Sequence, residues 1–355
     1  CAPPPPSTVG GAEVDAYGLD RSVLDHTAPD HTAPDHTALD PAPGELPQPA
    51  RRPTMYFIGV TTGRSSIRTV FPRWADALGL GDVPLVGIDL PPHAPAADYR
   101  RVVEFIAADP LSVGALVTTH KIDLYLACQD LFDEIDPLAR LMGEVSSLSK
   151  RGGRLVAHAK DPISSGLAID AFLPPGYWAR TGAEAFLMGA GGSAIAISWY
   201  LTRPERGADR PSRIVVSNRG VGRLDTLSRV HAELGTDVEV RTVHTPGPGD
   251  NDAVLAGLAA GSLVVNATGL GKDAPGSPLT DAARFPADAV AWDLNYRGDL
   301  VFLDQARAGG VHLEDGWVYF LHGWTQVIAE VFDVVIPTAG PRFDELGAIA
   351  SAARR

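Results

Sequence analysis

Short apolar runs alternate with longer amphipathic segments from residue 55 onward. The runs predict strands at 56–61, 85–90 and 114–119, and the segments between them predict helices at about 69–78 and 99–108. Strands separated by helices imply a parallel sheet that helices cover. We therefore expect an α/β domain that begins at residue 55.

The pattern after residue 121 changes to two further helices and a pair of extended segments. The helices are expected at about 122–131 and 137–142, and the extended segments at 144–150 and 154–159. Gly152-Gly153 lies between the extended segments, which predicts a β-hairpin. Asp161-Pro162 ends this region, so we place the end of the first domain at residue 163.

A strand, a tight turn and a helix are predicted by residues 184–199, EAFLMGAGGSAIAISW. The turn consists of Gly189, Ala190, Gly191, Gly192, Ser193 and Ala194. In a dinucleotide-binding βαβ unit the first glycine makes the turn, the second lets the backbone approach the pyrophosphate, and the third position keeps helix and strand close. Gly189, Gly191 and Ala194 fill these positions, although the same pattern also occurs in ordinary strand-to-helix turns.

A second strand at 213–217 ends in Asn218-Arg219, and Arg223 follows. Dinucleotide-binding folds contact the adenosine ribose at this point. An acidic residue here would select NAD, whereas arginines offer charge-assisted contacts to a 2′-phosphate. Arg219 and Arg223 therefore favour NADP, the alternative being that they only solvate a loop and a helix start.

The remaining apolar runs complete the second sheet. Strands are expected at 263–267 and 289–293, and the first ends in Asn266, Ala267, Thr268 and Gly269, whose backbone can line the cofactor. A helix at about 317–332 should return the chain to the first domain. The active site would then lie in the cleft between the two domains.

Composition narrows the class of protein. The chain has 355 residues with 45% hydrophobic content, which suits two domains. Its net charge of −13 argues against nucleic acid or an anionic membrane as partner. Cys1 and Cys128 are too few for a disulfide framework or a metal cluster, and no apolar run reaches the roughly 20 residues that span a bilayer. We expect a cytoplasmic protein without a metal that acts on a small molecule, as a monomer or a homodimer.

Residues 1–54 differ from the rest in composition. They hold 11 of the 30 prolines and three Asp-His-Thr-Ala repeats, beginning at Asp25, Asp30 and Asp35. Such a segment cannot bury a core, so it predicts a disordered arm. The three repeated histidines could bind a metal, but regular spacing in a proline-rich tract favours repeat expansion, and we assign them no chemistry.

Several short motifs share their order with those of one enzyme family. They are Gly59 to Leu80 with Ser65 and Leu78-Gly79-Leu80, Gly114 to Lys121, Gly143-Glu144-Val145-Ser146-Ser147, Ala159-Lys160-Asp161, Gly189 to Ala194, Asn218-Arg219, Asn266-Ala267-Thr268, Asp293 to Tyr296, and Asp315-Gly316. From about Tyr56 to its end, the chain resembles the shikimate dehydrogenase family.

The resemblance implies a two-domain α/β fold and an NADP-dependent oxidoreductase. The substrate domain would comprise residues 55–163, completed by carboxyl-terminal helices in 317–355, and the Rossmann-type NADP-binding domain residues 164–316. Hydride transfer would interconvert a hydroxyl and a ketone on a shikimate-related cyclic acid. The alternative is an NADP-binding paralogue with altered catalysis, either a sensor or a non-redox enzyme.

The substrate half departs from the family pattern. Ile67 stands where the family has a second serine, Gly323 where it has a glutamine, and Leu116, Ser146 and Ala159 where it has three asparagines. These replacements remove hydroxyl and amide groups that would meet a triol carboxylate. Shikimate itself is therefore expected to be a poor substrate, and the true substrate and the direction of reaction stay open.

The resemblance places Lys121 and Asp161 at the positions of the family's catalytic pair. Lys121 would be the acid/base that hydride transfer requires, and Asp161 would orient it. A lysine with its ordinary pKa near 10.4 is a poor base at neutral pH, so burial or cationic neighbours are expected to assist it. The alternative is a surface lysine and a helix-capping aspartate.

Five residues are candidates for binding the substrate: Arg64, Ser65, Arg68, Ser146 and Tyr296. Arginine suits a bidentate grip on a carboxylate. Arg64 and Arg68 are four residues apart at a helix start, however, and could equally form its solvated face.

Overall fold

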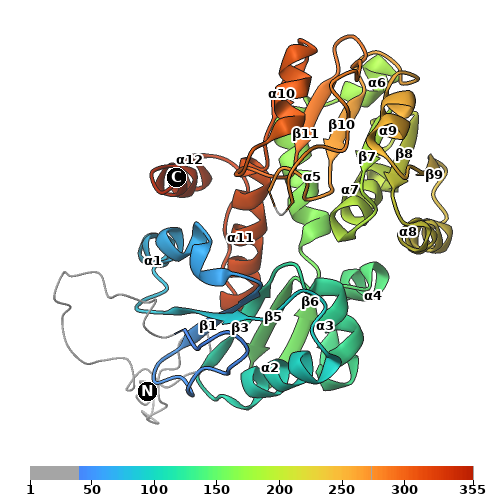
Figure 1. Ribbon diagram of the computed structural model, residues 1–355. Coiled ribbons are helices and arrows are strands. Elements are labelled where there is room, and N and C mark those ends of the chain that lie inside the picture. The colour runs from blue at the N-terminus through green and yellow to red at the C-terminus, as the bar shows by residue number, and fades with distance from the viewer. Residues whose placement is uncertain (1–39, 273, 355) are drawn as a thin grey trace, which may run out of the picture.

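The computed structural model describes residues 40–272 and 274–354, which form two six-stranded sheets with helices packed around them (Figure 1). In Figure 1 the amino-terminal sheet lies below and the carboxyl-terminal sheet above, and helices α5 (Asp161–Phe172) and α11 (Trp317–Phe332) run between them. Within the described residues, no helix is both long and apolar enough to cross a membrane.

The first sheet is mixed and has the strand order β2-β1-β3-β5-β6-β4. The strands are β1 (Thr54–Gly59), β2 (Leu85–Asp89), β3 (Ser112–Val117), β4 (Glu134–Ile135), β5 (Ser147–Arg151) and β6 (Arg154–His158). Strand β1 pairs in parallel with β2 and β3, whereas β5 is antiparallel to both β3 and β6. The predicted parallel sheet and hairpin are both present, and they share one sheet.

Four helices belong to this first domain: α1 (Ile67–Leu78), α2 (Ala96–Ala108), α3 (Lys121–Cys128) and α4 (Pro137–Met142). Helix α1 packs its apolar side, which includes the fully buried Trp74, into a core shared with α11 and the last helix of the chain. The Trp74 indole Nε1 donates to the carbonyl of Leu346 at 2.8 Å. Leu346 belongs to α12 (Pro341–Ser351), so the last helix of the chain packs on the first domain.

The second sheet is entirely parallel and has the order β12-β11-β10-β7-β8-β9. Its strands are β7 (Ala185–Met188), β8 (Arg213–Asn218), β9 (Glu239–His244), β10 (Leu263–Asn266), β11 (Val290–Asp293) and β12 (His312–Glu314), and its helices are α6 (Tyr177–Thr181), α7 (Gly192–Thr202), α8 (Val221–Leu234), α9 (Pro248–Leu255) and α10 (Val301–Ala308). Counted from β7, the order is that of the doubly wound dinucleotide-binding fold. This arrangement confirms the predicted fold class.

Helix α11 joins the two halves. It packs against α5, and it also packs on β5 and β3 of the first sheet. Ile328 and Phe332 are fully buried in the core that α11 shares with α1 and α12. The ends of α5 and α11 therefore fix where the two sheets meet.

Residues 40–53 lie against the first sheet, although the sequence assigned them to a disordered arm. The Asp40 carboxylate accepts from the backbone N–H of Gly87 at 2.7 Å and pairs with Arg68 at 2.9 Å. Backbone bonds from Gly44 to Asp89 and from Ala50 to the Asp109 carboxylate continue this contact. The repeats at 25–38 lie outside the described residues.

Candidate active site

The predicted catalytic pair is brought together at the junction of the two domains. Lys121 is the first residue of α3, one tight turn after β3 ends, and Asp161 is the first residue of α5. The Lys121 Nζ donates to the Asp161 carboxylate in an ion pair. The Asp161 side chain is only 9% exposed, so this pair is largely shielded from water.

Neighbouring charges set the protonation state of Lys121. Burial by itself lowers the pKa of this amine, but the Asp161 and Glu144 carboxylates outweigh burial and raise the Lys121 pKa above its ordinary value. From the sequence, burial or cationic neighbours were expected to lower the Lys121 pKa. The structure instead surrounds Lys121 with acids, which makes it an ammonium group at neutral pH.

A cavity of about 390 Å³ opens beside this pair. The first domain contributes Leu116, Val117, Thr118, Thr119, Lys121, Ser146 and Asp161; the second contributes Ser193, Ala267, Thr268, Gly269, Lys272, Leu294, Asn295 and Tyr296; and the segment at α11 contributes Gly316, Tyr319, Phe320, Gly323, Trp324 and Val327. Because both domains and the helix between them line the cavity, it is the cleft that the sequence predicted.

The glycine turn lies at the second-domain edge of this region. Gly189 has φ +104°, and a Cβ on it would lie 2.7 Å from the carbonyl oxygen of Ala267. Only glycine suits that position, because the turn approaches the end of β10 so closely. Ala190 and Ala194 within the turn are buried, and the N-terminus of α7 at Gly192 has no side-chain cap.

The loop after β10 is held by the fully buried Asn266. Its amide Nδ2 donates to the Leu270 carbonyl at 3.2 Å and to the Asp293 carboxylate at 3.1 Å, while its Oδ1 accepts from Thr268. Burial raises the Asp293 pKa to about 6. These bonds direct the backbone of Ala267, Thr268 and Gly269 toward the cavity.

The predicted phosphate-binding arginines lie at the start of α8. Arg219 and Arg223 are both exposed, and neither side chain has an ion-pair partner in the part of the chain that the structure describes. The Asn218 side chain donates to the Gly220 carbonyl at 2.9 Å and so closes the turn between β8 and α8. Both guanidinium groups are therefore available to a ligand at the end of β8.

The candidate substrate residues divide into two groups. Ser146 and Tyr296 line the cavity, whereas Arg64, Ser65 and Arg68 do not. Arg68 is a correction to the sequence analysis, because its guanidinium bonds to Asp40 and to the Leu85 carbonyl and its side chain is only 6% exposed. It fastens residue 40 to the first sheet, while Arg64 is exposed to solvent.

Sequence reasoning missed several polar groups of the cavity. Lys272 brings a second amine, Thr118 and Thr119 follow β3, and the Tyr319 phenol comes from α11. Burial raises the Tyr319 pKa well above its ordinary value, and the charge of Asp161 adds to this effect. The sequence alone could not single out Tyr319, because a helix rich in aromatic residues does not reveal which ring faces a cleft.

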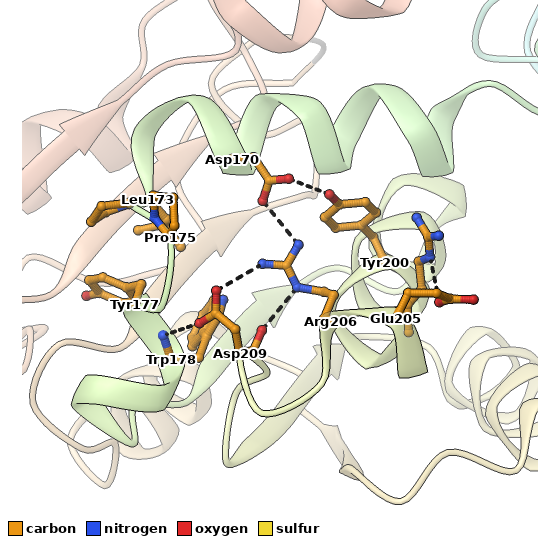
Figure 2. A pocket seen from close by; sticks show the side chains of 11 residues that line it. Asp170, Leu173, Pro175, Tyr177, Trp178, Tyr200, Glu205, Arg206 and Asp209 are labelled. Atoms are coloured by element: carbon orange, nitrogen blue, oxygen red, sulfur yellow. Dashed lines mark hydrogen bonds and ion pairs between the residues drawn. The ribbon is translucent and has the colours of Figure 1, made fainter.

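A second cavity, of about 400 Å³, lies away from this site (Figure 2). It is lined by the ends of α5 and α7, by helix α6 and by the segment that follows α7. Figure 2 shows the Arg206 guanidinium between Asp170 and Asp209, and Arg206 bonds to the Asp170 carboxylate at 3.1 Å. Glu205 is paired with Arg203. Because its charged side chains already pair with one another, this cavity offers no comparable chemistry.

Two sequence relatives share one name. A shikimate dehydrogenase (NADP(+)) of Symbiobacterium thermophilum is 32% identical over 193 residues, which are 54% of this chain and 61% of that protein. The protein of the same name from Methylocella silvestris is 26% identical over 285 residues, 80% of this chain and 91% of that protein. The match to the first relative thus spans about three fifths of its length. No family model matches the chain.

Solved structures share the fold. Quinate dehydrogenase from Corynebacterium glutamicum in complex with NAD superposes with a TM-score of 0.66 at 21% identity, over 85% of this chain and 99% of that one. Shikimate 5-dehydrogenase from Thermus thermophilus in complex with NADP(H) and shikimate gives 0.63 at 22% identity, over the same shares.

A doubly wound parallel sheet with a glycine turn, facing a second α/β domain across a cleft, defines a two-domain protein of the dinucleotide-binding class. The relatives narrow this class further. In sequence and in fold, the chain is similar to proteins of the shikimate dehydrogenase family. The predicted fold is confirmed, and these relatives support the predicted resemblance to that family.

Proposed function

We propose that the protein is an NADP-dependent oxidoreductase that interconverts a hydroxyl and a ketone on a shikimate-related cyclic acid. The observation that carries this proposal is the Lys121–Asp161 ion pair in a cavity that the nucleotide-binding domain also lines. The names of the sequence relatives support the reaction class and the cofactor.

Lys121 supplies the proton that ketone reduction needs. Its raised pKa keeps the amine charged at neutral pH, so the Nζ can donate to the substrate oxygen as negative charge develops on it. Asp161 holds the ammonium in place from the start of α5. This charge state suits reduction, since the reverse reaction requires a lysine that has already lost its proton.

The second domain offers the features that a dinucleotide phosphate needs. The start of α7 carries backbone N–H groups without a side-chain cap, and a Cβ on Gly191 would meet no protein atom, so the backbone there is open to a ligand. Arg219 and Arg223 would hold a 2′-phosphate. NADP would supply or accept the hydride when it is bound.

The lining of the cavity bears on substrate choice. Of the five replaced family positions, Leu116, Ser146 and Gly323 line the cavity, whereas Ile67 and Ala159 are buried in the core. A ring hydroxyl against Leu116 would lose water without gaining a partner, at a cost of about 1–3 kcal/mol. We infer that the substrate carries fewer ring hydroxyls than shikimate, and that Lys272 attracts its carboxylate.

The test is the change in NADPH absorbance with cyclic keto acids that differ in ring hydroxylation, including 3-dehydroshikimate. Turnover is expected to be highest for an acid with fewer hydroxyls, and Lys121→Ala should reduce it by about 10²–10⁴-fold with NADPH binding unchanged. Lys150→Ala is the matched control, because that lysine lies near the far end of β5 and donates to the Asp109 carbonyl, away from the cavity.

Two results would contradict the proposal. Full activity of Lys121→Ala would remove the assigned role of this lysine. Tight NADPH binding with no turnover of any keto acid would instead favour a paralogue that binds the nucleotide and has lost or changed the reaction.

A further inference from the structure

Glu144 links the first domain to the start of α7. It follows Gly143, which ends α4 in a left-handed conformation at φ +63°, and its side chain reaches toward the second domain. The Glu144 Oε2 lies 2.6 Å from the position that a Cβ on Gly192 would occupy.

The carboxyl of Glu144 is buried without a partner. The residue is 1% exposed, and neither carboxylate oxygen has a hydrogen-bond partner in the described ranges 40–272 and 274–354. An ionised carboxylate in such a place is strongly disfavoured, whereas a protonated one is tolerated.

The groups that face Glu144 come from three other helices. They are Lys121 of α3, Asp161 of α5 and Tyr319 of α11. Burial and the charge of Asp161 raise the Glu144 pKa to about 8, and Lys121 offsets only part of this effect. Glu144 is therefore neutral at pH 7 and ionises in the mildly alkaline range.

We propose that Glu144 belongs to the dinucleotide site and that a dinucleotide diphosphate binds only when this carboxyl is protonated. The inference rests on the proposed function, which places the diphosphate at the uncapped N-terminus of α7 beside Gly192. A protonated carboxyl can donate a hydrogen bond to a phosphate oxygen, whereas a carboxylate would repel it at close range. Nucleotide binding then takes up one proton once Glu144 has ionised in the free protein.

The sign of the pH dependence follows directly. Below the pKa of Glu144 the carboxyl already carries its proton, so binding is independent of pH. Above that pKa, the Kd should rise about tenfold for each pH unit. Lys121 and Tyr319 keep their protons in this range because the pKa of each is raised, and a cofactor phosphate with a second pKa near 6 is already ionised.

The experiment is the Kd of NADPH between about pH 7 and pH 9.5, measured by calorimetry in two buffers of different ionisation enthalpy. Near pH 9 the wild-type protein should take up close to one proton on binding, and Glu144→Gln about none. The amide keeps a donor and never ionises, so the Kd of this variant should stay flat with pH and be at least about tenfold lower than the wild-type Kd at the alkaline end. Glu144→Ala, which removes the group, should also abolish the pH dependence.

Three outcomes would overturn the inference. NADPH binding by the wild type with a flat Kd and no proton uptake would remove Glu144 from the site and leave the proposed function intact. The same slope in wild type and Glu144→Gln would assign the proton to another group. If neither protein bound NADPH at any pH, while circular dichroism showed both to be folded, the proposed function and this inference would fall together.

Discussion

At the scale of single residues, one lysine and two carboxyls share the space where the domains meet. Asp161 is paired with Lys121, whereas Glu144 has no hydrogen-bond partner within the described residues. Two carboxylates beside a single ammonium cannot both be neutralised by it, so the proton affinity of the unpaired one rises. Burial together with the charge of Asp161 therefore raises the Glu144 pKa, whereas the two acidic neighbours raise the Lys121 pKa in spite of its burial.

The choice between NADP and NAD is predicted to depend on one side chain, that of Arg219. Arg219→Asp should reverse a preference for NADP over NAD, because it replaces a charge-assisted contact worth about 1.5–3 kcal/mol with repulsion of the 2′-phosphate. The measurement is the Kd of each nucleotide by calorimetry. Arg229→Asp, farther along α8, makes the same charge change away from β8 and should leave the preference unaltered. Equal binding of NADP and NAD by the wild type would contradict the assignment.

Sequence patterns proposed some of these residues and missed others for a physical reason. Lys121, Asp161 and the glycine turn occur in ordered motifs, so a linear pattern can mark them. Glu144 could not be recognised in the same way, because its importance comes from a contact with Gly192 across the domain junction. Arg68 was misjudged since its partner, Asp40, lies in a proline-rich segment that showed no folding pattern.

At the scale of elements, strands in the sheet centres were the most predictable. Strands β1, β7 and β10 are buried along their whole length, so they appear as continuous apolar runs. Strand β9, at an edge, alternates exposed and half-buried residues, and β12 has only three residues. Neither produces an apolar run, which is why the sequence analysis found four of the six strands of the second sheet.

Helix α11 gives an element-scale prediction about stability. Ile328 is fully buried between this helix and the core of the first domain, so Ile328→Ala should lower the free energy of unfolding by about 2–5 kcal/mol through lost burial and a cavity. Val335, just beyond the helix, is 94% exposed, and Val335→Ala should change stability by less than about 0.5 kcal/mol. Urea unfolding followed by circular dichroism compares them. Equal effects of the two substitutions would mean that α11 is not anchored in this core.

At the scale of the whole molecule, the site exists only because two domains meet. The first supplies the Lys121–Asp161 ion pair, the second supplies the glycine turn, and α11 contributes Tyr319 between them. Besides His120, which is buried in the first domain, one further buried histidine lies in each half. His231 of α8 lies against α7 in the second domain, and His322 of α11 stacks on Phe343 of α12 beside the first.

Burial lowers the pKa of both His231 and His322 to about 4. The Nδ1 of each ring has no hydrogen-bond partner within the described part of the chain, so a proton added there would be a buried donor without an acceptor. In the unfolded chain a histidine titrates near 6.5, so the unfolded state binds more protons between that pH and about 4. Above pH 6.5 each histidine is neutral in both states and does not lower the free energy of unfolding. As the pH falls from 6.5 toward 4, that free energy decreases because the unfolded chain takes up the proton more readily.

Acidification from pH 7 to about 4.5 should thus weaken each domain by about 2–3 kcal/mol through its own histidine. Groups with raised pKa values, such as Asp293 and Glu144, instead increase the free energy of unfolding as the pH falls. The informative quantity is therefore the difference in this free energy between a variant and the wild type. His322→Phe keeps a ring against Phe343 but cannot ionise. Its free energy of unfolding relative to wild type should rise by about 2–3 kcal/mol over this range, as measured by urea unfolding at each pH.

His231→Leu provides the matched comparison in the other domain. The Ser198 hydroxyl, which His231 contacts at 2.8 Å, also donates to the Ile195 carbonyl, so removal of the ring does not leave this donor unpaired. If the domains unfold separately, each substitution should flatten the acid dependence of one transition and leave the other unchanged. If α5 and α11 couple the domains into one cooperative unit, both substitutions should act on the same single transition. A difference between variant and wild type that stays constant with pH would show that neither histidine titrates as its burial requires.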